Sequence, residues 1–96
     1  SEALDRDATR LDALIFRAAA YRLLEVPDLA RDDIARALVV DPDNPDALME
    51  LGAVQAGVGQ FDAARKSWLR VLSIAPGSRA GGAAREALQQ MDLKVQ

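Results

Sequence analysis

The chain repeats itself with a period of 34 residues, and this repeat restricts its fold more than any other feature. When the sequence is shifted by 34 positions, residues of several chemical types match in one unbroken register. The matched pairs are Asp12 with Asp46, Ala13 with Ala47, Leu14 with Leu48, Ala19 with Ala53, Asp28 with Asp62, Ala30 with Ala64, Arg31 with Arg65, Arg36 with Arg70, Leu38 with Leu72 and Pro42 with Pro76. Alanine and leucine often match by chance, but aspartates, arginines and prolines in one register indicate a true repeat. A period of this length is typical of stacked structural units.

Each repeat unit has the apolar periodicity of two helices. In the second unit, apolar residues recur at helical spacing from about Pro45 up to Gly57 and Gly59, which accept left-handed backbone angles. A second run with three- and four-residue spacing begins at Phe61 and stops before Pro76. The unit is therefore predicted to be a helical hairpin.

An acidic segment, DPDNPDALMELG at residues 41–52, lies between the two units. The segment does not match a calcium loop of the EF-hand type. The fifth ligand position falls on Pro45 and the twelfth on Gly52, and neither residue has a side-chain oxygen. Interpreted as a bend, it places Pro42 after one helix and Asn44 at the N-cap of the next. We therefore expect a turn and no metal site.

Composition argues against most kinds of catalysis. The 96 residues contain neither cysteine nor histidine. Thiolate nucleophiles, disulfides, the usual zinc ligands and the side chain that most often moves protons near neutral pH are therefore missing. The carboxylates are all expected to be helix caps or solvated groups. We predict that the protein is not an enzyme and that it uses no cofactor.

Charge and hydropathy restrict the partners. The 15 acidic and 12 basic residues give a net charge of −3, so the usual electrostatic attraction to nucleic acid is missing. No apolar run has the length of a membrane span, and we expect no membrane insertion. Because the chain begins with Ser1, we expect a processed product or a part of a longer protein. A cytoplasmic and a periplasmic location both remain open.

The repeat units resemble the tetratricopeptide family, whose pattern is W-x2-L-G-x2-Y, then A-x3-F, then P. The second unit reads Leu48-x2-Leu51-Gly52-x2-Gln55, then Ala64-x3-Trp68, then Pro76. The first unit reads Leu14-x2-Arg17-Ala18-x2-Tyr21, then Ala30-x3-Ile34, then Pro42. Glu25 and Pro27 replace the glycine and the aromatic residue that the family favours between its helices. The first unit is therefore a divergent repeat. The family pattern does not predict the conformation of its inter-helix turn.

The resemblance implies an all-α fold, a right-handed superhelix of antiparallel helical hairpins with about five helices. Residues 1–96 are expected to form one domain: 1–10 extend the first helix, 11–44 are repeat 1, 45–78 are repeat 2, and 79–96 are a capping helix. Small residues permit close helix contacts at Gly52, Ala18, Ala30 and Ala64. Large residues are expected to fill the space between hairpins at Trp68, Phe61 and Leu72.

In the family, the first helices of the repeats line a concave face that binds a peptide or helix of a partner protein. The matching positions here are Asp12, Ile15, Ala19, Arg22, Asp46, Met49, Ala53 and Ala56, continued by Ala83, Ala87 and Gln90. For Ile15 and Met49, an ordinary place in the core is the alternative interpretation. A well-known subclass binds the terminal carboxylate of chaperones through lysine, arginine and asparagine. Those positions are Ile15, Ala19, Glu50, Ala80 and Ala84 in this chain, so the carboxylate clamp is missing.

Two alternative functions accompany this hypothesis. The first is self-association, in which apolar groove or end surfaces of two copies pair to form a homo-oligomer. The second rests on a tryptophan in the second helix followed by a proline and an Ala/Arg-rich closing helix. That arrangement is similar to bacterial tetratricopeptide proteins of cytochrome c maturation. The preference for arginine over lysine, with abundant alanine, is typical of a GC-rich bacterial genome.

Overall fold

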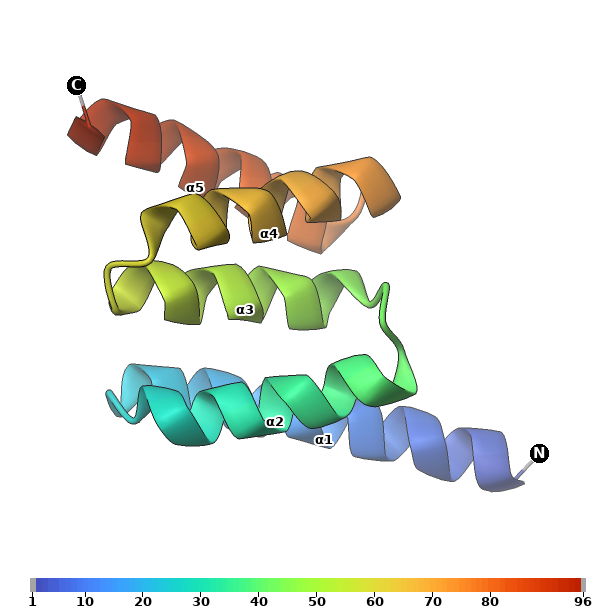
Figure 1. Cartoon of the computed structure of the whole chain (residues 1–96). Helices are drawn as coiled ribbons and strands as arrows, with labels where there is room; N and C mark the ends of the chain where they lie inside the picture. The colour runs from blue at the N-terminus through green and yellow to red at the C-terminus, as the bar shows by residue number, and fades with distance from the viewer. Residues whose placement is uncertain (1, 96) are drawn as a thin grey trace.

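Five α-helices account for most of the chain (Figure 1). The structure is a computed structural model that describes the backbone of residues 2–95 and the side chains of residues 10–92. The helices are α1 (Glu2–Leu23), α2 (Pro27–Val40), α3 (Pro45–Gly57), α4 (Phe61–Ile74) and α5 (Arg79–Val95). Residues 2–95 contain no strand. The prediction of an all-α fold with about five helices is confirmed.

The period of the sequence is also a period of helix boundaries. The first helices of the two units end at Leu23 and Gly57, which are 34 residues apart. The second helices begin at Pro27 and Phe61 and have the same length, 14 residues. The helix α1 starts at Glu2 and runs for 22 residues, so residues 2–10 of the expected extension 1–10 are helical, and Ser1 lies outside the described residues.

The acidic segment between the units is a helix boundary. The side chain of Asn44 accepts a hydrogen bond from the Ala47 amide at 2.9 Å, and Pro45 is the first residue of α3. Asp43 binds the guanidinium of Arg70 at 2.6 Å. Thirty-four residues after Asn44, Ser78 accepts in the same way from the amide of Gly81, at 3.0 Å. The interpretation of this segment as a bend is confirmed.

The two hairpin turns have the same hydrogen bonds although their sequences differ. In the second turn, Gly59 is in the left-handed region with φ 85°, and in the first turn Glu25 takes that place with φ 62°. The Glu25 amide donates to the Arg22 carbonyl at 3.1 Å, and the Gly59 amide donates to that of Ala56 at 3.1 Å. Glu25 therefore adopts a conformation that favours glycine.

The core consists of two adjoining clusters. The first lies between α1, α2 and α3 and the second between α3, α4 and α5, and Leu38 and Leu51 pack against both. The buried members of the first cluster are Ala18, Ala30, Ile34 and Val54. Those of the second are Leu48, Ala64, Trp68, Val71, Ala80, Ala84, Leu88 and Met91. Each cluster joins the two helices of a hairpin to the helix that follows them. The apolar side chains of each hairpin are therefore buried together with those of the next helix.

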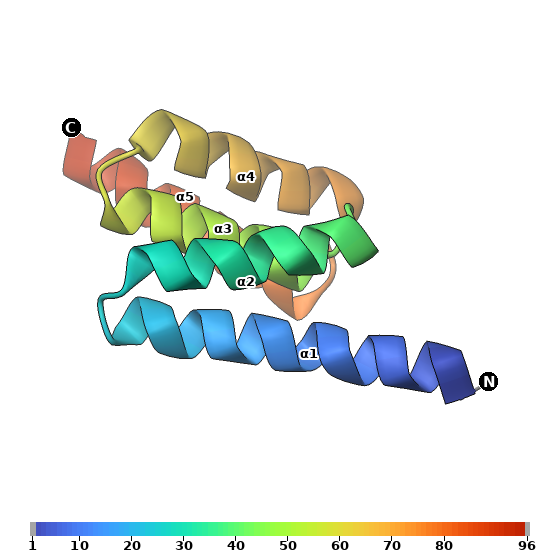
Figure 2. The same cartoon turned by 60° about the horizontal axis from the view of Figure 1, so that its bottom comes forward.

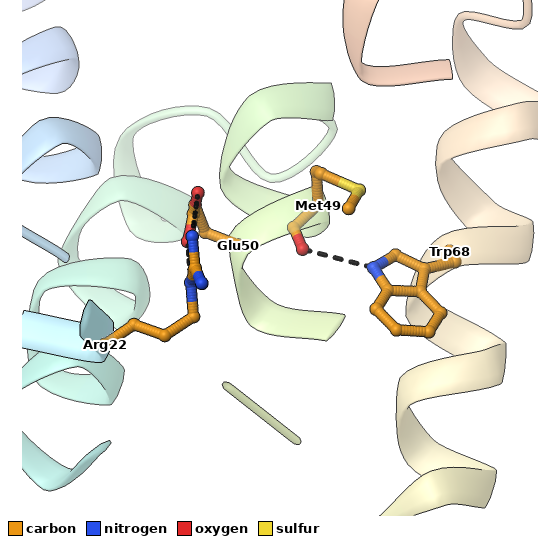
Figure 3. A network of polar contacts seen from close by, with 4 residues as sticks. All are labelled: Arg22, Met49, Glu50 and Trp68. Atoms are coloured by element: carbon orange, nitrogen blue, oxygen red, sulfur yellow. Dashed lines mark hydrogen bonds and ion pairs between the residues drawn. The ribbon is translucent and has the colours of Figure 1, made fainter. Parts of the chain in front are cut away.

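Trp68, predicted to fill the space between hairpins, is buried in the cluster of α3, α4 and α5, where Gly52 of its own hairpin makes room for it. A Cβ atom on Gly52 would lie 2.6 Å from Cδ1 and 2.7 Å from Cε2 of the indole ring, which is too close for any side chain. The indole Nε1 donates to the carbonyl oxygen of Met49 at 3.2 Å (Figure 3). Leu72 is partly buried against the same cluster.

The prediction for Phe61 is wrong. Its side chain is 53% exposed, so it does not fill the space between hairpins. The cause is its place at the start of α4, because the cluster between α3, α4 and α5 begins one turn later, at Ala64.

The first helix of each unit lies beside its counterpart. The helix α3 contacts α1 on one side and α5 on the other, and α2 and α4 pack against α1 and α3 as their hairpin partners (Figures 1 and 2). The N-terminal part of α1 projects beyond the end of α2 (Figure 1). The molecule therefore has one surface to which α1, α3 and α5 all contribute.

Candidate functional site

A groove with a volume of about 640 Å³ lies where α1, α3 and α5 come together. Four of its lining residues come from α1, four from α3, and the rest from the start of α5 and the residue before it. They are Asp12, Ile15, Phe16, Ala19, Pro45, Asp46, Met49, Glu50, Ser78, Arg79, Ala80 and Ala83. The apolar residues among them are alanines, one proline and three larger side chains, so the groove combines an apolar lining with charged groups.

The structure brings five of the eight residues expected from the sequence into this groove. They are Asp12, Ile15, Ala19, Asp46 and Met49, and Ala83 of α5 joins them. Met49 also packs against the cluster between α3, α4 and α5, so it belongs to the core as well as to the groove lining. Ile15 is half-buried and lies in the groove.

Three of the expected residues lie elsewhere. Arg22 and Ala53 line a second hollow at the other end of the helices, next to the hairpin turns. Ala56 is half-buried against the core. In the expected continuation on α5, Ala87 also packs against the core and Gln90 is exposed. The reason is that the groove is lined only by residues within 12–19, 45–50 and 78–83, so residues farther along α1, α3 and α5 lie outside it.

Sequence reasoning missed Phe16 and Arg79. Phe16 is 81% exposed and forms one edge of the groove. The repeat register contained a signal for it, because a phenylalanine stands where the next unit has Glu50. Arg79 lines the groove because it is the first residue of α5. The start of that helix is fixed by the cap at Ser78.

An ion pair joins α1 to α3 at the end of the groove. The Arg22 Nε lies 2.8 Å from Oε2 of Glu50, and its Nη2 lies 3.5 Å from Oε1 (Figure 3). Glu50 lines the groove and Arg22 lines the second hollow, so the pair lies between the two. The pair bridges α1 and α3, and it engages the charge of Glu50.

A bidentate ion pair joins Arg17 to Asp33 outside the groove. The Arg17 Nε and Nη2 each lie 2.7 Å from an oxygen of Asp33, whose side chain is buried. The hydrogen bonds from Arg17 lower the pKa of Asp33, against the opposing effect of burial. The Asp33 carboxylate in turn raises the pKa of Arg17. This pair ties α1 to α2, and its role is structural.

The groove is lined by both apolar and charged side chains. Its charged groups are Asp12, Asp46, Glu50 and Arg79, and Glu50 is already paired. Among the described residues, His, Cys, Asp and Glu side chains nowhere gather in a group of three or more that would hold a metal ion. Within residues 2–95, no helix combines the length and apolar character that crossing a bilayer requires.

The fold and the groove define the class of this protein: an all-helical domain whose first, third and fifth helices surround an open apolar groove. No known protein-family model matches the chain, and no solved structure matches it.

Proposed function

We propose that the protein is a non-catalytic interaction module that binds a peptide or helix of a partner protein in the groove between α1, α3 and α5. The observation that carries the proposal is the composition of the groove, whose apolar lining consists of alanines, Pro45, Ile15, Met49 and, at one edge, Phe16. Small side chains let a ligand backbone approach closely, and the larger ones supply apolar contact area. Grooves of this kind accept an amphipathic segment whose apolar side chains point inward.

The proposal includes a tetratricopeptide-like arrangement, a right-handed superhelix of hairpins. Three observations support it. The helix boundaries repeat every 34 residues, the two hairpin turns have matching hydrogen bonds, and the first helices of successive units are in contact. In such arrays each unit contacts only its neighbours, and the first helices line the binding surface.

The charged groups of the groove restrict the ligand. Asp12 and Asp46 occupy equivalent places on α1 and α3, and Arg79 lies at the start of α5. A ligand with a basic residue beside the two aspartates would gain electrostatic complementarity. A free terminal carboxylate would meet like charge there, in agreement with the missing carboxylate clamp.

The test is selection of peptide ligands followed by measurement of their affinities. A displayed library of random and helical peptides would be panned against the protein, and selected peptides would be titrated by calorimetry. We expect saturable binding that weakens at least tenfold in Met49→Arg and in Ala83→Arg, because each places a cation in the apolar lining from a different helix.

The matched control is Val39→Arg on α2, where the native side chain is 83% exposed and does not line the groove. Its affinity should equal that of the wild type, and circular dichroism should show that all variants are folded. Selected peptides that bind both groove variants with wild-type affinity would refute the groove as the binding site.

A further inference from the structure

The outer face of α1 carries an apolar stripe that the fold leaves uncovered. Ala13, Phe16, Ala20 and Leu23 recur with spacings of three, four and three residues, and all four are exposed. Phe16 is 81% exposed and Leu23 is 74% exposed. Leu24 extends the stripe at the end of the helix. The spacing is that of the a and d positions of a heptad, which forms the contact seam between paired helices.

The repeat register shows what these positions do when a neighbour is present. In α3, the counterparts of Ala13 and Ala20 are Ala47 and Val54, and both are buried. Val54 packs against the cluster of α1 and α2. The counterpart of Phe16 is Glu50, which forms the ion pair with Arg22 of α1. The same face of a first helix is therefore an interface in the second unit and open in the first.

We propose that a second copy of this chain covers this stripe, with the α1 helices of the two copies packed side by side in parallel. Charge complementarity favours the parallel arrangement. Asp12 precedes the stripe at a g position and Arg17 follows Phe16 at an e position. In a parallel helix pair, a g residue faces the e residue five positions later on the partner helix. Asp12 of each copy then meets Arg17 of the other.

Arg17 has donors available for this contact. Its Nε and Nη2 bind Asp33, and a guanidinium offers five N–H donors, so its Nη1 is not used by that ion pair. Its side chain is 53% exposed. In an antiparallel arrangement g positions face g positions and e positions face e positions, so Asp12 would not face Arg17 across the seam.

The other end of the molecule does not fit the stripe. The outward face of α5 carries Arg85, Glu86, Gln89 and Gln90, all exposed and polar. A head-to-tail contact of α1 with α5 would pair an apolar surface with a polar one, whereas pairing of α1 with itself buries apolar side chains on both sides. The interaction is therefore isologous and closes at a dimer. The dimer does not require the proposed peptide binding, although Asp12 and Phe16 lie at both the stripe and the groove.

The first experiment is sedimentation over protein concentrations from about 1 μM to 1 mM, the range expected for a small interface. We expect a monomer–dimer equilibrium in the wild type. Phe16→Asp should raise the dissociation constant at least tenfold, because it places a carboxylate in the seam. Val39→Asp on α2 is the matched control and should leave the dissociation constant unchanged. A strict monomer over the whole range would overturn the proposal.

The second experiment uses the absence of cysteine from the chain. In a parallel pair, Ala13→Cys and Ala20→Cys each place the new thiol next to its copy, so both variants should form a disulfide-linked dimer under mild oxidation. Val39→Cys should form it more slowly by at least tenfold. Cross-linking of only one of the two seam variants would indicate antiparallel helices. Cross-linking at the rate of the control would show that the stripe is no interface, and either result would refute the parallel dimer.

Discussion

The turn between α1 and α2 offers a quantitative test of the repeat, because Glu25 occupies the place of a glycine. Its φ of 62° lies in the left-handed region, which costs an ordinary residue about 1–2 kcal/mol. Glycine avoids that cost but loses about 0.5–1 kcal/mol of backbone entropy on folding. Glu25→Gly should therefore stabilise the protein by about 0.5–1 kcal/mol, equivalent to about 2–8 °C in Tm for a domain of this size.

The assay is thermal and urea unfolding, followed by circular dichroism and by the fluorescence of Trp68, the single tryptophan. Glu25→Ala removes the charge but keeps a Cβ at the left-handed position, so it should leave stability nearly unchanged. Gly59→Ala puts a Cβ at the left-handed position of the equivalent turn. That Cβ would meet no atom within 4 Å, so the change tests backbone strain without a steric clash. It should cost about 1 kcal/mol. Equal effects of Glu25→Gly and Glu25→Ala would refute the reasoning, since the gain would then come from charge.

Three further predictions concern the interior. Gly52→Ala should destabilise the protein by about 1–3 kcal/mol in urea unfolding, because its Cβ would overlap the Trp68 ring; a cost below about 0.5 kcal/mol would contradict the close contact. Trp68→Ala should cost about 3–5 kcal/mol and leave little cooperative unfolding in a calorimetric scan, whereas a well-folded variant would show that the indole is dispensable. Arg17→Ala should lose stability at neutral pH by leaving the carboxylate of Asp33 buried without its partner. The pKa of Asp33 is lowered in the folded protein, so this stabilisation exists above the carboxyl group's unfolded pKa and disappears as the pH falls through its folded value. Unfolding curves of wild type and Arg17→Ala should therefore converge in acid, and a constant difference at all pH values would contradict the ion pair.

The sequence predicted those parts of the fold that depend on local chemistry. Helix ends followed from Asn44 and Pro45, because capping and the fixed φ of proline act within a few residues. The closing-helix boundary at Ser78 follows the same chemistry. Much of the groove was also predictable, because residues at equivalent repeat positions face the same side.

Other features depend on distant partners and could not be predicted in this way. Asp33 and Ser67 are equivalent buried polar residues, but Asp33 binds Arg17 of α1 whereas Ser67 donates to Gln55 of α3 at 2.7 Å. Each partner lies at least 12 residues away on another helix, and a single sequence contains no signal that joins them. The exposure of Phe61 likewise depends on where the neighbouring helix crosses α4.

The helices that line the groove, α1 and α3, differ in the burial of their residues from their hairpin partners α2 and α4, and this difference decides which positions tolerate substitution. In the second helices, the equivalent pairs Ala30 and Ala64, Ile34 and Trp68, and Ala37 and Val71 are all buried. The groove residues Ile15, Ala19 and Met49 on the first helices are only half-buried. Buried positions resist substitution because packing and cavity costs act together, whereas half-buried positions at an open groove lose less. The residues that hold the hairpins together are thus largely separate from those that line the groove. Substitutions in the groove should therefore change which peptide binds while the helices and their boundaries remain as they are.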